Sequence, residues 1–214
     1  MGVSVDMSTS HSVSASLPRL LRQRLSALML ATSLGLAAPV AMAQSLPPPD
    51  IGGRSWFLFD VSTNTVLYSQ APDERVEPAS LTKLMTAYVV FGALRDGTLN
   101  LDTRPPVSQA AYKAIGSRMF VDPRKPATVD ELLHGLIIQS GNDAAIILAE
   151  AVSGSEEAFA QQMNAEARRI GMKNSHFVNA SGLPAPEHHS TARDMALLAT
   201  RIIKEFPDYY RMYS

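Results

Sequence analysis

The chain has 214 residues, of which 46% are hydrophobic, a formal net charge of −1 and no cysteine. This composition is typical of a globular protein of about one domain and not of a disordered chain. A net charge near zero gives no electrostatic reason to expect binding to nucleic acid or to an anionic membrane surface. The absence of cysteine excludes disulfide frameworks and zinc–thiolate sites.

A secretory signal peptide is predicted for residues 1–43. Three arginines between positions 19 and 24 precede an apolar run from Leu25 to Val40, and Ala41-Met42-Ala43 then gives a small-x-small cleavage pattern. The run is shorter than the ~20 residues that a membrane-spanning helix needs. We therefore expect cleavage near Gln44 and export of the mature chain.

The next segments predict a linker and a β-hairpin. Residues 44–54 include three consecutive prolines, which favour an extended polyproline conformation and disfavour a helix. Aromatic and branched residues are then frequent in Ser55–Phe59 and Thr65–Tyr68, and Ser62-Thr63-Asn64 between them favours a turn.

Helical patterns dominate the rest of the chain. A first apolar helix is expected over residues 81–94, ending at the stop signal Asp96-Gly97. A capping box, Thr128 with Glu131, predicts a second helix start, and Thr191 with Asp194 predicts another. Further helices are expected over residues 142–152, 156–170 and 192–206.

One pair of residues near the first of these helices has the pattern of a nucleophile and its base. In "PASLTKLMTAYVV", Ser80 and Lys83 are three positions apart, which places them on the same face of a helix. A serine hydroxyl becomes a nucleophile when a neighbour accepts its proton, and a lysine does so when burial keeps its amine neutral. The ordinary alternative is a helix-capping serine beside a solvated lysine.

A second polar group interrupts two very apolar segments in "IIQSGNDAAIILAE". Ser140, Gly141 and Asn142 are expected at a turn between two buried helices, where polar side chains point into a cleft. The alternative interpretation is a loop with a helix cap, because serine and asparagine favour both.

Together these motifs resemble a known family. "PASLTKLMTAYVV", "SGND", "NSHFVNASGLP" and "HSTARDMALLATRIIKEFPDYY" are similar to the serine-type D-alanyl-D-alanine carboxypeptidases, which are low-molecular-mass penicillin-binding proteins. The resemblance implies an α/β (α+β) transpeptidase fold, with an antiparallel sheet and a helical subdomain, for residues 55–214. It also implies a place in the periplasm or cell-wall space.

The resemblance implies a role for each candidate residue. Ser80 would attack the penultimate D-alanine of a peptidoglycan stem peptide, and Lys83 would accept the Ser80 proton. Ser140 would relay a proton to the leaving D-alanine, and Asn142 would hold the substrate amide and orient Lys83. β-Lactams would acylate the same serine, and no metal or organic cofactor is implied.

One family motif does not occur in this chain. The Lys-Thr-Gly motif, which the resemblance places on a strand beside the cleft, is absent from the 214 residues. We expect this chain to be truncated before that motif, to lack C-terminal strands and any C-terminal membrane anchor, and to be weakly active or inactive. Loss of one oxyanion donor alone costs ~3 kcal/mol of transition-state stabilisation.

Two other functions are compatible with some of these residues. A class A β-lactamase shares the Ser-x-x-Lys pattern, but it has Ser-Asp-Asn where this chain has Ser140-Gly141-Asn142, and no Glu-x-x-Leu-Asn loop is present. A non-catalytic penicillin- or peptidoglycan-binding module is the other alternative. The adjacent His188 and His189 are interpreted as part of a solvent-exposed loop and not as metal ligands.

Overall fold

The N-terminal part of the fold is a two-stranded antiparallel hairpin. Strand β1 (Trp56–Asp60) pairs with β2 (Thr65–Gln70), with a register irregularity between Leu58 and Phe59. The Asp60 carboxylate accepts hydrogen bonds from the backbone N–H groups of Ser62 and Thr63, which fixes the turn. The hairpin that the sequence predicts is therefore confirmed.

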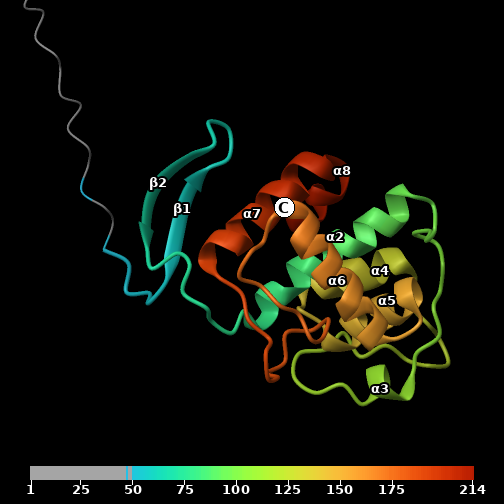
Figure 1. Ribbon diagram of the computed structural model, residues 1–214. Coiled ribbons are helices and arrows are strands. Elements are labelled where there is room, and N and C mark those ends of the chain that lie inside the picture. Colours follow the sequence, from blue (N-terminus) through green and yellow to red (C-terminus); the bar gives the residue numbers. More distant parts are fainter. Residues whose placement is uncertain (1–46, 48–49) are drawn as a thin grey trace, which may run out of the picture. The chain divides into compact units, whose positions relative to one another are not determined.

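This architecture comes from a computed structural model that describes residue 47 and residues 50–214 (Figure 1). The predicted signal peptide and residues 44–46, 48 and 49 of the predicted linker lie outside the described residues. Within residues 50–214, no helix is long and apolar enough to cross a membrane.

The elements that follow the hairpin are all helical. In chain order they are η1 (Ala79–Leu81), α2 (Thr82–Arg95), α3 (Gln109–Tyr112), α4 (Val129–Ile138), α5 (Asn142–Ser153), α6 (Glu156–Ile170), α7 (Ala192–Glu205), α8 (Pro207–Tyr210) and η2 (Arg211–Tyr213). Helices α2, α5, α6 and α7 agree with the predicted ranges to within one residue at each end, and α4 begins directly after the predicted cap Thr128. The four-residue helix α3 was not predicted, because so short a segment has no detectable period.

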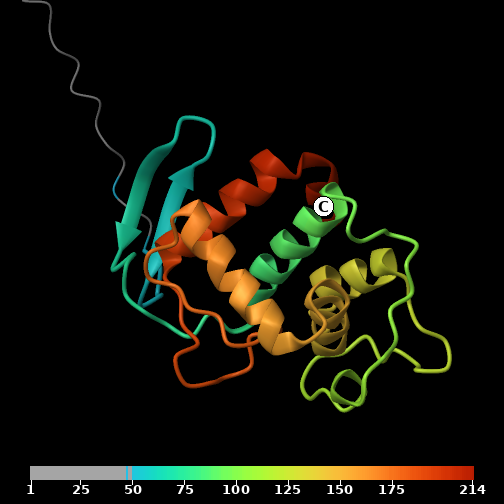
Figure 2. The ribbon, with the colours of Figure 1, turned by 45° about the vertical axis from the view of Figure 1, so that its right-hand side comes forward.

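Helix α2 forms the centre of the helical part. It contacts α4 and α5 on one side and α6 and α7 on the other, as Figure 2 shows. Apolar side chains along all of its faces are buried, including Met85, Val90 and Phe91, each 0% exposed. Helix α5 is almost as deeply buried, so the core that α2 and α5 share fixes the relative positions of the segments at their N-terminal ends.

Helix ends follow the predicted signals in most places. The Thr128 side chain accepts from the Glu131 N–H while the Glu131 carboxylate accepts from the Thr128 N–H, so this capping box is confirmed. At α7, Thr191 caps the helix, but Asp194 does not complete the box. The Asp194 carboxylate accepts instead from the Asn174 N–H and the Ser175 hydroxyl.

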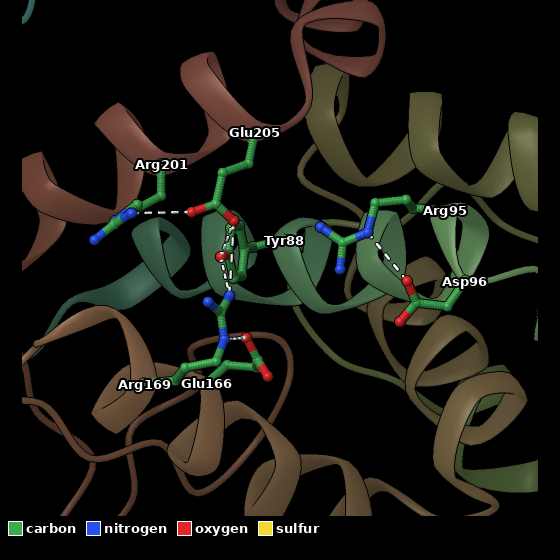
Figure 3. Close-up of polar contacts among 7 residues, drawn as sticks. All are labelled: Tyr88, Arg95, Asp96, Glu166, Arg169, Arg201 and Glu205. Carbon is green, nitrogen blue, oxygen red and sulfur yellow. Dashed lines mark hydrogen bonds and ion pairs between the residues drawn. The ribbon is translucent and has the colours of Figure 1, made fainter.

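A polar network ties α2, α6 and α7 together (Figure 3). The Tyr88 hydroxyl donates to Glu205 at 2.6 Å and accepts from the Arg169 guanidinium. Glu205 also pairs with Arg201, and Arg169 with Glu166. Burial and the neighbouring Glu205 carboxylate raise the pKa of Tyr88 to about 12, so the phenol stays a donor.

Candidate active site

Ser80 lies in a strained turn that precedes helix α2. The backbone of Ala79 has a φ of 45°, in the left-handed region that residues with a side chain rarely adopt. Ala79 and Ser80 are the first two residues of η1, and neither η1 nor α2 has a side-chain cap. Ser80 is therefore not the helix-capping serine of the ordinary interpretation. Its side chain is exposed, and among the described residues its hydroxyl makes no hydrogen bond.

Lys83 lies in the first turn of α2 and is buried. Its side chain is only 6% exposed, and its Nζ donates to the Ser181 carbonyl at 2.6 Å. Because burial disfavours the charged form, the pKa of the Lys83 amine falls to about 8. A substantial fraction of the amine is therefore neutral near pH 8.

Ser140 lies in the turn between α4 and α5. Its backbone also has a positive φ, 56°, so a second strained residue occurs at this site. Its hydroxyl oxygen is buried and has no hydrogen-bond partner among the described residues. An unpartnered buried hydroxyl is uncommon, since most buried polar atoms are paired. This hydroxyl is thus free to donate to a ligand or accept from one.

One pocket of about 360 Å³ brings these three side chains together. It is lined by Pro78, Ala79, Ser80, Leu81, Lys83, Leu84, Leu136, Ile137, Ser140 and Tyr213. Apolar residues surround a hydroxyl, an amine and a second hydroxyl, which are the groups that nucleophilic acyl transfer requires. The sequence pattern did not indicate Tyr213, which is far along the chain from Ser80, Lys83 and Ser140.

Asn142 follows Ser140 closely in the chain, but its side chain is hydrogen-bonded within the protein. Its side chain is 6% exposed, and its amide nitrogen donates to the Ile115 carbonyl at 2.7 Å. Gly116 lies directly against that amide, 2.8 Å from an added Cβ. The structure thus places Asn142 as an anchor for the loop before α4, and its predicted contact with substrate and with Lys83 stays a prediction.

Asp143, in the same motif, anchors that loop as well. Its two carboxylate oxygens accept from the backbone N–H groups of Met119, at 3.0 Å, and Val121, at 3.2 Å. A carboxylate that accepts several backbone N–H groups is a rigid anchor. The sequence motif indicated no role for Asp143. The pattern that hints at one is an acidic residue in the first turn of a helix that is otherwise apolar.

A larger pocket of about 630 Å³ lies elsewhere on the described part of the chain. Its lining includes Tyr112, Arg118, Phe120 and Asp143, and it contains none of the predicted catalytic residues. The chemistry of the smaller pocket, and not its size, therefore identifies the candidate active site.

Residues 177–183, which we call the strap, pack against the first two turns of α2. Three side chains, two outside the strap and one within it, hold its backbone. Asn164 pairs with both the N–H and the carbonyl of Phe177, Glu156 accepts from the Ala180 N–H, and Asn179 accepts from the Gly182 N–H. The strap supplies the Ser181 carbonyl that holds Lys83, and nothing in the sequence pattern indicated this contact.

Gly182 brings the strap directly under the Ser80 turn. Its φ is 87°, and a Cβ added there would lie 1.9 Å from the carbonyl oxygen of Ala79. Only a residue without a side chain allows this approach.

The structure differs in part from the prediction that His188 and His189 lie in a solvent-exposed loop. His188 is 4% exposed and is bonded on both ring nitrogens, so the expectation of a solvent-exposed loop is wrong for this residue. The neighbouring Glu187 is exposed and His189 is half-buried. Within the described residues, no group of three or more histidine, aspartate or glutamate side chains is arranged to hold a metal ion.

Fold and pocket together define a class of protein. A serine at a strained turn, a buried lysine one helical turn further on and a second serine in one pocket are the groups of a serine hydrolase that forms an acyl-enzyme. The comparisons with known proteins are consistent with this class. The family model for D-alanyl-D-alanine carboxypeptidase matches residues 40–214.

The chain belongs to this family of serine peptidases. D-alanyl-D-alanine carboxypeptidase DacC of Escherichia coli is 42% identical over 189 residues, which cover 84% of this chain and 47% of that protein. The crystal structure of DacD from Francisella tularensis has a TM-score of 0.75 at 38% identity, covering 86% of this chain and 44% of the other. These likenesses support the predicted penicillin-binding-protein fold.

A second similar structure was solved with a β-lactam bound. Penicillin-binding protein D2 from Listeria monocytogenes, in the ampicillin-bound form, has a TM-score of 0.68 at 28% identity and covers 76% of this chain and 66% of its own. The present chain spans about half the length of the curated relatives that it matches.

Proposed function

We propose that this chain carries the acyl-enzyme chemistry of a serine-type D-alanyl-D-alanine carboxypeptidase. The observation that supports the proposal most directly is one pocket lined by Ser80, Lys83 and Ser140, with the lysine buried and its pKa lowered to about 8. Family membership supports the substrate, a peptidoglycan stem peptide that ends in D-alanyl-D-alanine.

In the first step, Ser80 Oγ bonds to the carbonyl carbon of the penultimate D-alanine. The neutral Lys83 amine takes the hydroxyl proton as the bond forms, and a tetrahedral oxyanion results. The backbone N–H of Ser80 lies in the first turn of a helical segment, where N–H groups have no intrahelical acceptor. It is therefore our candidate for one donor to the oxyanion.

In the second step, the bond between the carbonyl carbon and the leaving nitrogen breaks. The leaving D-alanine amine needs a proton, which Lys83 now holds as ammonium. The unpartnered Ser140 hydroxyl relays this proton, since it can accept from the amine and donate to the leaving group at once. The product is an ester of Ser80, and water with Lys83 as its base then hydrolyses that ester and frees the serine.

β-Lactams are proposed to acylate the same hydroxyl. The similar Listeria protein, described in an ampicillin-bound form, supports this class of inhibitor. We further propose export to the periplasm or cell-wall space, which rests on the signal-peptide pattern of residues 1–43. Fractionation of cells that express the chain, with N-terminal sequencing of the product, tests the export.

Two measurements on the same preparation test the proposed function. A fluorescent penicillin should label the chain on Ser80, as peptide mass mapping would show, and Ser80→Ala should abolish the label. Because the 214 residues contain no Lys-Thr-Gly, we expect labelling to be slow and D-alanine release from a D-alanyl-D-alanine peptide to be weak.

The outcomes separate the candidates. A stable adduct with no D-alanine release supports the alternative of a penicillin-binding module, and rapid hydrolysis of penicillin supports a β-lactamase. No label on Ser80 would contradict the acyl-enzyme proposal, and full turnover would contradict the expected weakness of this chain.

A further inference from the structure

The His188 imidazole is held in one tautomer by its two partners. Nδ1 accepts from the Val178 N–H at 3.0 Å, and because a backbone N–H can only donate, Nδ1 carries no proton. The ring proton is then on Nε2, which donates to the Thr82 hydroxyl at 2.8 Å. Protonation of Nδ1 would set two donors against each other, so this geometry requires a neutral ring.

The Thr82 bond is one of three that join the strap and its neighbour His188 to the start of α2. Lys83 Nζ donates to the Ser181 carbonyl at 2.6 Å, and one turn later the Thr86 hydroxyl donates to the Ala180 carbonyl at 2.7 Å. All three side chains of α2 in these bonds are at most 6% exposed. The Thr82 bond is the nearest of them to the Ser80 turn.

The same histidine also holds the strap from its other side. Its Nδ1 accepts the N–H of Val178, a strap residue three positions before Ser181, and its ring lies edge-on to Phe177 at 5.9 Å between centroids. His188 therefore bridges the strap and α2. The bridge fixes the distance between the backbone of the strap and the helical turn that carries Lys83.

The position of the Ser181 carbonyl matters for the chemistry of the amine. A neutral amine has one lone pair, and donation of one N–H to Ser181 restricts the direction in which that lone pair points. The strap also covers the amine, and burial is the cause of its lowered pKa. A strap that moves away would let water reach Lys83 and would release the direction of its lone pair.

We propose that His188 is a positioning residue for Lys83, acting through its Nε2–H bond to Thr82 and its Nδ1 contact with Val178. It does not touch the reacting atoms. It holds the strap against α2, so that the Ser181 carbonyl keeps the Lys83 amine buried and oriented. The consequence for catalysis rests on the proposed function, whereas the consequence for the amine does not.

The test uses a matched pair at the acceptor. Thr82→Val keeps the volume and removes the hydroxyl, whereas Thr82→Ser keeps the hydroxyl. The readout is competitive labelling of Lys83 in the 214-residue chain by a small amine-reactive reagent, measured by mass spectrometry across pH. In the unsubstituted chain the labelling midpoint should lie near 8.

We expect Thr82→Val to move the midpoint upward, toward the ordinary lysine value, because the amine becomes hydrated. A shift of one pKa unit lowers the neutral fraction at pH 8 about fivefold. Thr82→Ser should keep the original midpoint, and His188→Phe should behave as Thr82→Val does. The variant His134→Gln, at an exposed histidine on α4, controls for the loss of a histidine as such.

If the Thr82→Val variant folds and its Lys83 is labelled with the same pH profile as in the unsubstituted chain, the proposal is wrong. If that variant does not fold, nitrogen NMR of the unsubstituted chain decides, since a proton on Nδ1 of His188 would overturn it and a proton on Nε2 alone would support it. Neither readout needs a substrate. Failure of penicillin to label Ser80 would thus contradict the proposed function without affecting this inference.

Discussion

The amine of Lys83 owes its expected reactivity to the place where its side chain is buried. A lysine of ordinary pKa, 10.5, is almost fully protonated near neutral pH and cannot accept a proton from serine. Burial lowers that value to about 8. The positive end of the α2 dipole acts in the same direction, because it disfavours a cation in the first turn.

The first prediction concerns pH. Since only the neutral amine accepts the Ser80 proton, the rate of labelling by a fluorescent penicillin should rise with pH and level off above about 8. Lys83→Met should lower this rate by about a hundredfold or more. Lys125→Met, at an exposed lysine, is the control and should keep the original profile. Labelling of Lys83→Met at the original rate would exclude the lysine as the base.

The burial of Lys83 also predicts how the free energy of unfolding depends on pH. The folded state has the lower pKa, so between about 8 and 10.5 the unfolded chain binds more protons than the folded one. The contribution of Lys83 to the free energy of unfolding should therefore increase with pH across this window. Denaturant titrations of the chain and of Lys83→Met at several pH values measure the difference, and equal pH slopes would contradict a buried amine.

Substitution of Gly182 tests whether Ser80 depends on the close packing of the strap against its turn. Gly182→Ala would place a Cβ 1.9 Å from the Ala79 carbonyl, so the Ser80 turn or the strap must move. We expect labelling of Ser80 to fall by at least tenfold and the melting temperature to drop. Gly92→Ala is the matched control, because an added Cβ meets nothing within 4 Å inside α2. That variant should gain about 0.5–1 kcal/mol from helix propensity.

Among the elements, those with strong local signals were predictable from sequence. The apolar run of α2, the capping box of α4 and the branched residues of the hairpin all specify local structure through short-range physics. The grouping of Ser80, Lys83 and Ser140 was expected from the resemblance to a family. The burial of His188 was not predictable, because it depends on Thr82, 106 positions earlier in the chain.

The polar network between helices α2, α6 and α7 is predicted to contribute to the stability of the protein. Tyr88→Phe removes a hydroxyl that donates to Glu205 and accepts from Arg169, and it leaves the two charged groups 3.6 Å apart (Figure 3). We expect a loss of about 1–2 kcal/mol in the free energy of unfolding, measured with denaturant. Asp96→Asn is the control.

That control removes an ion pair with Arg95 whose two side chains are 54% and 60% exposed. Such surface pairs contribute little, so Asp96→Asn should change stability by less than about 0.5 kcal/mol. A Tyr88→Phe variant as stable as Asp96→Asn would show that the network adds nothing to the packing of these helices.

For the whole molecule, the hairpin is only partly covered by its surroundings. Helix α7 contacts β1, and Arg193 lies over the Phe57 ring at 4.9 Å, but Leu58, Val66 and Leu67 are 41–50% exposed. Among the described residues the sheet has two strands only. Exposed apolar side chains on the edge strands of a sheet promote association between chains.

We therefore expect concentration-dependent association of the 214-residue chain in light scattering. Leu67→Lys should reduce it, because a charge on an exposed strand opposes edge-to-edge pairing. Thr63→Lys adds the same charge in the exposed hairpin turn and should have a smaller effect. Equal effects of the two variants would indicate a general effect of net charge.

The strap has a consequence for exchange of its amide protons with deuterium. It has no regular secondary structure, yet the N–H groups of Phe177, Val178 and Ala180 donate to side chains carried by α6 and by His188. These protons are released only when the strap separates from the helices. They should therefore exchange nearly as slowly as those of α2, although a segment without helix or strand normally exchanges fast.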